Sequence, residues 1–391
     1  MNLADNEPSL LRSTDSRRLS LVGIVDRRKA GTELTDSRPE AVRDCIQSLL
    51  SSARAAPRDE ANQLSAGQRA RIVQGPQESD VGLLTQKAGE LLDFLRSETP
   101  KVMLRLGEAK HTLVRSHTLT SGGSEIETSV GHHSLTAFGV GREGTRVSSL
   151  QMAYGHCHEM AGHASAYFGI GEMLRSLERQ LDARPVGDKF VGDVVLTPQA
   201  VADCIGWLLG QICDEPLIAG TSLYRDRVGH AVGSPLLNLR SRFDGPGIAA
   251  VSPDGFVAPP VEILREGVLQ TLTPSRYASL KTGVPHVPIA AGGWEVAAGD
   301  TPYADVVAQS ARGALVGRLS MGRPAANGDF AGVIKNSFAI VDGKVGHALS
   351  ETMICGNVAR MLLDVVAVSQ ERLDTGSLLL PWVRISGLHF S

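Results

Sequence analysis

Aromatic side chains are scarce in this chain: they make up 4% of its 391 residues, whereas glycine occurs 42 times. Long apolar runs are missing too, since each one stops well short of the roughly 20 residues that a membrane-spanning helix needs. The first fifteen residues do not follow the charged-then-apolar pattern of a secretory signal peptide. The sequence therefore favours a turn-rich globular protein, and we expect no membrane partner.

Neither sign of charge is in excess. The 39 lysines and arginines nearly balance the 42 aspartates and glutamates, so the formal net charge of −3 gives no reason to expect nucleic acid as a partner. The five cysteines are scattered, odd in number and form no CxxC pair, which indicates reduced thiols rather than a disulfide framework. We therefore expect a cytoplasmic protein.

Apolar periodicity predicts the elements of the first half. The segment 37–40 (SRPE) is interpreted as a capping box that opens a helix, and a second helix is predicted over about 80–97. The polar segment 56–80 between them is predicted to be a loop. Alternation over 101–152 predicts several strands of an antiparallel sheet separated by glycine turns, and 158–181 is predicted to be helical.

The apolar pattern of the second half predicts alternating strands and helices. A strand is predicted over 189–196, followed by a helix that begins at Pro198. Another helix is predicted over 303–315. The Asp342-Gly343 pair between apolar runs predicts a tight hairpin, and a further helical pattern begins at Val358.

The segment 155–163 (GHCHEMAGH) is the strongest candidate for chemistry. It contains HExxxH, in which His158 and His163 are potential zinc ligands and Glu159 a potential general base. A zinc-binding helix places its histidines four residues apart, whereas a spacing of five puts them about 140° apart around an ideal helix. The alternative interpretation is the polar first turn of a helix.

Two weaker patterns are explained without a ligand. The segment 139–144 matches GxGxxG, but more strand follows it, so a hairpin turn is favoured over a dinucleotide site. His132 and His133 are adjacent in an alternating strand, so they point to opposite faces and do not share one metal.

The C-terminal third carries a family resemblance. Residues 328–368 (GDFAGVIKNSFAIVDGKVGHALSETMICGNVARMLLDVVAV) and 375–388 (TGSLLLPWVRISGL) resemble the closing domain of the TldD/PmbA family, and more closely its PmbA, or TldE, branch. Upstream, residues 28–54, 192–211 and 243–283 are similar, in register, to earlier segments of that family. The resemblance covers nearly the whole chain, apart from an N-terminal portion that is shorter.

The resemblance implies an α+β fold of two domains, with mixed and antiparallel sheets and packed helices. On this basis the chain divides into a disordered leader over 1–16, a shortened TldE-like N-terminal domain over 17–185 and a TldD/PmbA-type C-terminal domain over 186–391.

The resemblance also bears on the metal site. TldD subunits of the family are metallopeptidases that carry HExxxH on the helix after a VVL strand, and a late cysteine completes their zinc site. With Val194, Val195 and Leu196 laid on that strand, the corresponding positions are Gly206, Trp207, Gln211 and the Thr375-Gly376-Ser377 run. Neither glycine nor tryptophan ligates zinc, and an amide is a poor substitute for imidazole.

The resemblance therefore implies a non-catalytic TldE-like subunit with no metal and no catalytic residue of its own. It would pair with a TldD-like catalytic subunit that holds the zinc and hydrolyses a peptide or amide, in peptide or natural-product maturation. The alternative is that the chain is itself a metallohydrolase that uses His158, Glu159 and His163. No substrate-chamber residue is assigned, beyond the expectation that segments 290–300 and 328–336 line the chamber.

Overall fold

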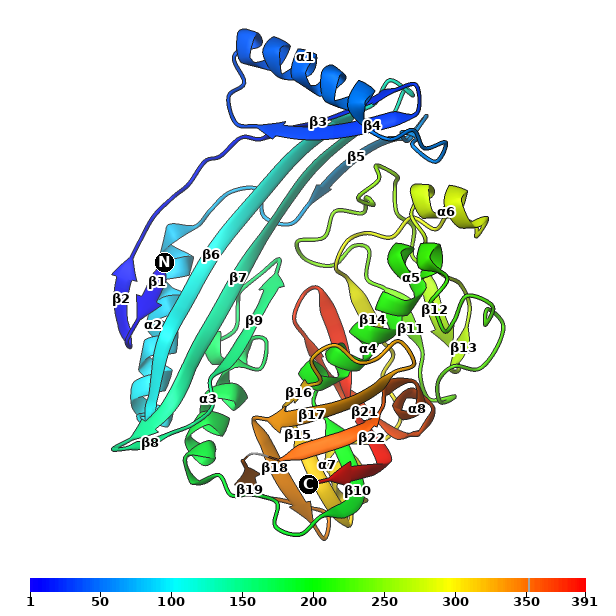
Figure 1. The fold of residues 1–391 in the computed structure, drawn as a ribbon. Coiled ribbons are helices and arrows are strands. Elements are labelled where there is room, and N and C mark those ends of the chain that lie inside the picture. Colours follow the sequence, from blue (N-terminus) through cyan, green and yellow to red (C-terminus); the bar gives the residue numbers. More distant parts are fainter. Residues whose placement is uncertain (351) are drawn as a thin grey trace.

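The computed structural model describes residues 1–350 and 352–391 and confirms the predicted α+β class. Within those residues the chain forms a seven-stranded, a thirteen-stranded and a two-stranded sheet, with helices packed against them (Figure 1). Both large sheets contain parallel as well as antiparallel pairs. The strands of the seven- and two-stranded sheets precede residue 186 and those of the thirteen-stranded sheet follow it.

The elements before residue 186 are β1 (Asn2–Ala4), β2 (Glu7–Leu10), β3 (Leu19–Val25), β4 (Arg28–Leu34), α1 (Pro39–Ala55), β5 (Arg69–Gln74), α2 (Val81–Glu98), β6 (Val102–Leu119), β7 (Glu125–Glu143), β8 (Arg146–Val147), β9 (Gln151–Cys157), the 3-10 helix η1 (Ala164–Ala166), α3 (Ile170–Arg179) and the 3-10 helix η2 (Gln180–Asp182).

The seven-stranded sheet is built on a ribbon of two very long antiparallel strands, β6 and β7 (Figure 1). Its order is β2-β1-β6-β7-β5, and β8 and β9 also pair with β7. The prediction of several antiparallel strands over 101–152, separated by glycine turns, is confirmed: β6 turns into β7 at Gly123, and β7 turns into β8 at Gly144. The glycines inside β7 mark close approaches to neighbouring backbone instead. A Cβ on Gly131 would lie 1.8 Å from the carbonyl oxygen of Pro76. In the 139–144 segment, the chain stays in β7 up to Glu143 and turns only at Gly144.

The disordered leader predicted over 1–16 is wrong for its first ten residues. β1 pairs with β6, and β2 pairs with β1. Leu3 is buried against Gly107, where the absence of a side chain leaves room for it. The Asn6 amide accepts from the N–H of Leu104 at 2.8 Å and donates to the carbonyl of Val102 at 2.7 Å. One buried leucine and one bidentate amide thus order a segment whose composition is polar.

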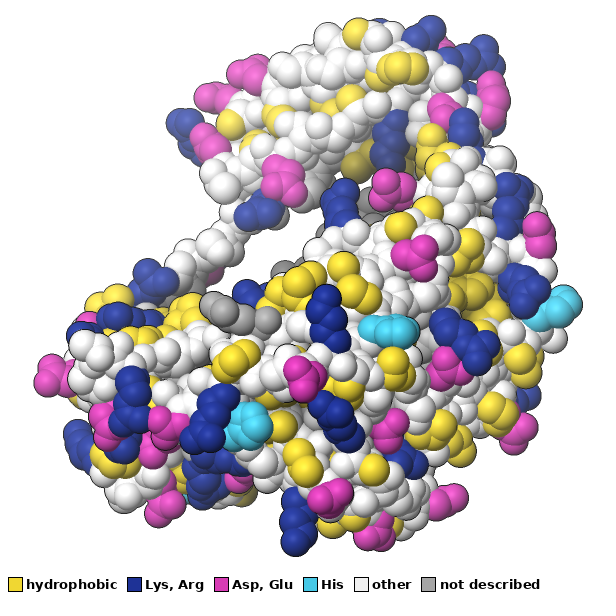
Figure 2. Space-filling model, turned by 60° about the horizontal axis from the view of Figure 1, so that its bottom comes forward, with side chains coloured by type: hydrophobic (Ala, Val, Ile, Leu, Met, Phe, Trp, Pro, Cys, Tyr) yellow, Lys and Arg dark blue, Asp and Glu magenta, His cyan; other side chains and the backbone are white. Residues whose placement is uncertain are grey.

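The hairpin β3–β4 and α1 form a small unit at the far end of the ribbon from α3 (Figure 1). The predicted helix is confirmed, but the capping box at 37–40 is wrong: the N-cap is Arg38, without a side-chain cap bond. The residue before a proline is held in extended backbone, so Arg38, not Ser37, precedes the first turn. Figure 2 shows a hollow between this unit and the body, and cationic and anionic side chains interspersed over the visible face.

Two further predictions for the first half are tested by the structure. The helix over 80–97 is confirmed as α2, whose N-cap Asp80 accepts from the N–H of Leu83 at 3.0 Å. The loop over 56–80 is interrupted by β5, which runs parallel to β7. No residue of β5 is buried, and the apolar side chain of Val73 lies on the exposed face, so the segment carries only a weak strand signal.

The elements after residue 186 are β10 (Phe190–Leu196), α4 (Pro198–Ile212), α5 (Asp214–Ala219), β11 (Leu239–Ser241), β12 (Glu262–Arg265), β13 (Val268–Leu269), α6 (Arg276–Thr282), β14 (Trp294–Val296), α7 (Tyr303–Ala308), β15 (Arg312–Val316), β16 (Arg318–Ser320), β17 (Asp329–Lys335), β18 (Ser337–Val341), β19 (Lys344–Leu349), β20 (Met353–Asn357), α8 (Val358–Leu363), β21 (Val365–Asp374) and β22 (Leu378–Phe390).

The thirteen-stranded sheet has the main order β13-β12-β11-β14-β22-β10-β15-β18-β19. The β10 strand, the α4 helix and the β18–β19 hairpin at Asp342-Gly343 confirm their predictions, and both turn residues have positive φ. The helix over 303–315 is wrong after Ala308, and the helix from Val358 ends at Leu363. In both places the chain becomes a strand, β15 or β21, because pairing within the sheet outweighs helical periodicity.

The main hydrophobic core packs α4 and α8 against the thirteen-stranded sheet, and a second core packs α2 and α3 against the seven-stranded sheet. Leu208 of α4 and Leu174 of α3 are fully buried in these cores. No helix within the described residues is both long enough and apolar enough to cross a bilayer.

Candidate functional site

A cavity of about 730 Å³ lies where the seven-stranded sheet meets the thirteen-stranded sheet; we call it the central cavity. A cavity of this size with mostly apolar walls and a few polar groups is the usual form of a small-molecule or peptide site. Its walls come from β9, α3, the start of α4, and strands β15, β18, β21 and β22. Its lining includes Met152, Tyr154, Glu172, Arg175, Arg179, Asp203, Tyr303, Asn336, Phe338, Glu371, Thr375, Leu378, Leu380 and Trp382.

The α4 helix contributes an acidic group to this cavity because its sequence divides into two faces. Val201, Ile205 and Leu208 are buried in the main core, whereas Ala202 and Asp203 line the cavity. Pro198 fits the first turn, where its fixed φ is already helical and its missing N–H is not needed.

Asp203 is half-buried and strongly perturbed. Burial raises the pKa of the Asp203 carboxyl to about 6, although two weaker effects oppose it. The N–H of Leu319 donates to Oδ2 at 3.3 Å, and the positive charge of Arg318 favours the ionised form. At neutral pH the carboxyl is therefore mainly ionised, at a cost in free energy.

This cost gives a prediction about stability. An acid whose pKa rises from 3.8 to about 6 on folding destabilises the native state progressively as the pH rises through that interval. We expect Asp203→Asn, which keeps an acceptor for Leu319, to raise the free energy of unfolding by about 2–3 kcal/mol at pH 7.5. The gain should vanish near about pH 2.5, well below 3.8, where Asp203 is protonated in both the folded and the unfolded wild type. Urea unfolding at the two pH values measures it, with exposed Asp44→Asn as control; equal stability at pH 7.5 would contradict the burial argument.

Several other polar groups of the cavity are already engaged, whereas the buried Oδ1 of Asn336 has no hydrogen-bond partner among the described residues. Arg175 donates to Glu172 at 2.7 Å, and the Arg179 guanidinium lies 4.2 Å above the ring of Phe338. The exposed Glu371 accepts from the backbone N–H of Tyr303 at 2.7 Å. Tyr303 and Trp382 pack with their ring centroids 5.0 Å apart, and burial raises the pKa of the Tyr303 hydroxyl.

The strand β9 presents a free edge to the cavity. It pairs with β7 on one side, and on the other the N–H of His156 donates to the carbonyl of Thr375 at 3.0 Å. Backbone groups alternate sides along a strand, so those of Tyr154 and Met152 point the same way as those of His156. Both residues line the cavity, and their outward backbone groups are available to an extended chain.

The positions that the resemblance assigns to zinc have different surroundings in the structure. Gly206 is exposed, Trp207 packs edge-on against Tyr224 with ring centroids 6.1 Å apart, and the Gln211 Oε1 accepts from the N–H of Leu223 at 3.3 Å. Thr375 lines the central cavity, which the other three do not. This donor set does not fit a zinc ion, because glycine has no ligand atom and the indole N–H only donates.

The HExxxH run lies on no helix, so the helix predicted over 158–181 is wrong at its start. β9 continues to Cys157, and α3 begins only at Ile170, after Gly169, which has a left-handed φ of 72°. His158 and exposed Glu159 follow the strand, and His163 caps η1 by accepting from the N–H of Ser165. Within the described residues, the ligand atoms of His158, Glu159 and His163 do not converge.

The loop that carries this run is held to α2 by a buried ion pair. The Lys87 ammonium, with its side chain 2% exposed, lies 3.0 Å from a carboxylate oxygen of Glu90 and donates to the carbonyl of Gly162 at 2.7 Å. Glu90 in turn accepts from the N–H of Ala164 at 2.8 Å. The polar residues of 158–163 thus belong to a packed connection between β9 and α3.

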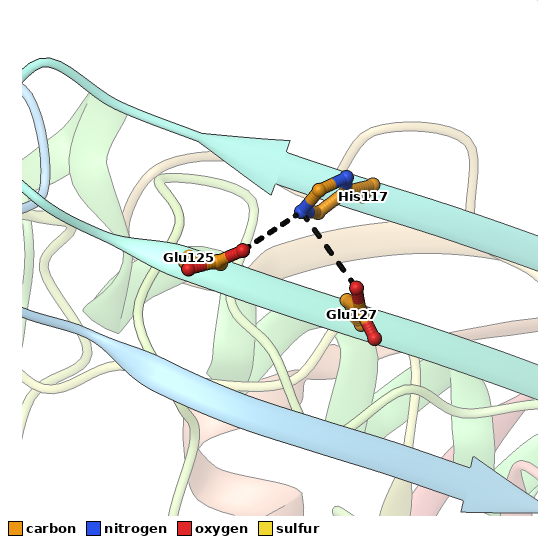
Figure 3. A group of neighbouring side chains, drawn as sticks. All are labelled: His117, Glu125 and Glu127. Carbon is orange, nitrogen blue, oxygen red and sulfur yellow. Dashed lines mark ion pairs between the residues drawn. The ribbon is translucent and has the colours of Figure 1, made fainter.

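One group of side chains in the described residues does bring potential metal ligands together. His117 of β6 lies 3.5 Å from Glu125 and 3.9 Å from Glu127 of β7, and all three are exposed (Figure 3). Arg71 of β5 lies 3.8 Å from Glu127 and competes for that carboxylate. The group lies near the turn between β6 and β7, away from the central cavity, and is explained as surface ion pairing across the ribbon.

The opposite orientation predicted for His132 and His133 is confirmed. The ring of His132 packs on that of His156 with centroids 4.5 Å apart, whereas His133 packs on His111 at 5.3 Å. Burial and then the neighbouring imidazole of His156 lower the pKa of His132 to about 4. Burial also lowers the pKa of His133 and of His156, so these two rings and that of His132 are neutral packing groups at neutral pH.

A second hollow of about 660 Å³ opens at the β3–β4 turn and is lined by Arg27, Arg28 and Arg58. Arg27 and Arg58 both pair with Glu60, and Arg28 donates to the carbonyl of Ala56. The guanidiniums are therefore used within the fold.

Sequence reasoning missed Asp203, Lys87 and the β9 edge. An aspartate in the second turn of a helix carries no signal of its own, although its apolar neighbours Ala202 and Cys204 set it apart from a fully solvated face. Of the segments expected to line a chamber, 328–336 contributes Asn336 to the central cavity, and 290–300 contributes none of its lining residues.

Comparison with known proteins agrees with this architecture. Residues 190–391 match the family model described as PmbA/TldA metallopeptidase C-terminal domain. TldE from Thermococcus kodakarensis has a similar structure, with a TM-score of 0.85 at 19% identity over 100% of this chain and 93% of that one. A comparison with curated proteins gives no match.

Two further solved structures share the fold, and both were described as candidate modulators of DNA gyrase. The one from Thermotoga maritima has a TM-score of 0.80 at 14% identity and covers 100% of this chain and 92% of its own. The one from Bacteroides thetaiotaomicron has a TM-score of 0.80 at 20% identity over 95% of this chain and 87% of that one. The family match spans more than half of the sequence, and the chain therefore belongs to the PmbA/TldD metallopeptidase family.

Proposed function

We propose that this chain is a non-catalytic, TldE-like subunit that pairs with a TldD-like zinc metallopeptidase. In that pair it would handle the substrate, a peptide or amide, and the partner's zinc would hydrolyse it. By analogy with the family, we place the pair in peptide or natural-product maturation. The scattered, odd-numbered cysteines favour a cytoplasmic location.

The observation that carries this proposal is the set of side chains at the family's zinc positions. Gly206 and Trp207 stand in place of the His-Glu pair, and Gln211 in place of the second histidine. The amide oxygen of Gln211 is also engaged with the N–H of Leu223. A chain with these residues retains the helix of the family's site but not its metal chemistry.

The central cavity and the free edge of β9 support the substrate-handling part. An extended chain laid along β9 would hydrogen-bond to the outward backbone groups of Met152 and Tyr154. Its side chains would alternate between solvent and the apolar wall that contains Leu378 and Leu380. Such main-chain pairing accepts many sequences, as a peptide-processing complex requires.

The test is reconstitution with a TldD-like protein encoded beside this one. We expect the two chains to co-elute in size-exclusion chromatography, and a casein-derived peptide mixture to be hydrolysed by the pair and not by this chain alone. Replacing the partner's HExxxH glutamate by glutamine should abolish hydrolysis. Hydrolysis by this chain alone, or full activity of the partner without it, would contradict the proposal.

The competing function is a metallohydrolase centred on His158, Glu159 and His163. One observation favours it: the buried Nε2 of His158 has no hydrogen-bond partner among the described residues. Metal analysis of the purified chain separates the two functions. Stoichiometric zinc that is lost in His158→Ala would support the metallohydrolase and displace the subunit proposal.

A further inference from the structure

Among the described carboxyl groups that line the central cavity, Asp203 alone is half-buried and without a cation, since Glu172 and Glu371 are both exposed. The cavity is lined by three carboxyl groups, those of Glu172, Asp203 and Glu371, and by the guanidiniums of Arg175 and Arg179. Glu172 and Arg175 form an ion pair, and Glu371 is exposed and accepts the N–H of Tyr303. Among the described residues, no lysine, arginine or histidine forms an ion pair with Asp203.

The remaining charges near Asp203 do not neutralise it. Arg179, on α3, stacks on the ring of Phe338, and no ion pair joins it to Asp203 among the described residues. Arg318, on β16, acts on Asp203 only through space, and burial outweighs its effect. A carboxylate in apolar surroundings gains more from a cation than one in water does, because the effective dielectric constant around it is lower.

We propose that the central cavity binds an apolar chain segment that carries one cationic group, an ammonium or guanidinium, and that this group pairs with Asp203. The assignment deepens the proposed substrate-handling function and rests on it. The hydrocarbon part of the segment packs on Leu378, Leu380 and Trp382, and the cation occupies the part of the central cavity that Asp203 lines. An anionic residue at the same place is rejected, because it would lie against an uncompensated carboxylate.

The experiment compares three synthetic peptides that differ at one position: acetyl-Ala-Leu-Xaa-Leu-Ala-amide with lysine, norleucine or glutamate as Xaa. Each is titrated into the purified full-length chain by isothermal calorimetry at pH 7.5. We expect the lysine peptide to bind at least tenfold more tightly than the norleucine peptide, and the glutamate peptide more weakly than both. In Asp203→Asn, which should fold at least as stably as the wild type, the lysine and norleucine peptides should bind equally.

The pH dependence adds a second readout. Lowering the pH from 7.5 to 5 protonates Asp203 in the free protein, so the preference for lysine should shrink in the wild type and stay flat in Asp203→Asn. Asp193→Asn serves as the control, because Asp193 lies outside the cavity lining and faces Arg384 at 3.7 Å. It should keep the tenfold preference.

Equal binding of the three peptides, no binding of any, or a lysine preference that survives in Asp203→Asn would overturn the assignment. These measurements use the isolated chain and involve no hydrolysis. Lysine-selective binding without reconstituted hydrolysis would therefore contradict the subunit function alone. Reconstituted hydrolysis with no preference for lysine would contradict this assignment alone.

Discussion

Lys87→Met is expected to lower the free energy of unfolding by about 3 kcal/mol. The Lys87 side chain is 2% exposed, and its loss leaves the Glu90 carboxylate without its cation and the carbonyl of Gly162 without a donor. Urea unfolding followed by circular dichroism measures the change. Amide hydrogen exchange over 158–166 should also speed up, because the ion pair holds that loop to α2.

The same helix offers a matched control. Arg96 and Asp93 form another i,i+3 pair at 3.0 Å, but their side chains are 68% and 76% exposed. Arg96→Met should therefore cost less than about 1 kcal/mol. If the two variants were equally stable, or if Lys87→Met were stabilising, the ion pair would not be what holds the loop.

Gly376→Ala is expected to lower the free energy of unfolding by about 4 kcal/mol, from left-handed backbone and overpacking together. Gly376 has a φ of 86°, and a Cβ there would lie 2.3 Å from the carbonyl oxygen of His156. The contact joins β9 to the turn before β22, so the substitution should also separate two walls of the central cavity. Thermal unfolding by calorimetry gives the loss of stability.

Gly387→Ala measures the cost of the left-handed backbone in the absence of a steric contact. Gly387 has a φ of 84°, and a Cβ there would have no neighbour within 4 Å. Its substitution should cost only about 1–2 kcal/mol for the left-handed backbone. Similar losses in both variants would show that the close approach to His156 contributes nothing.

Local signals predicted those elements whose determinants are close in sequence. The Asp342-Gly343 turn, the α2 helix and the start of α4 at Pro198 each depend on a few neighbouring residues. The helix predicted over 303–315 runs into β15, because the apolar spacing of that segment suits either structure. Ala314 of β15 becomes a strand residue only through its pairing with Val194 and Ala339, both distant in the chain.

The candidate site was less predictable than the fold. The resemblance identified Thr375, which lines the central cavity, and Gly206, Trp207 and Gln211, which do not. Asp203 was missed because its pKa depends on walls supplied by α3, β18 and β22, and no local pattern encodes that environment. The HExxxH motif was misleading because its residues lie in the connection between β9 and α3 and not on a helix.

The connectivity of the two large sheets has a consequence for how they form. β6 and β7 follow each other directly, so their ribbon closes through a short turn, whereas β10 meets its antiparallel partner β22 only after all the elements from α4 to β21. Closing a long loop costs more entropy and delays the contacts that repay it. The β6–β7 ribbon is therefore expected to form early in folding. The walls of the central cavity are expected to assemble only in the last, slow step.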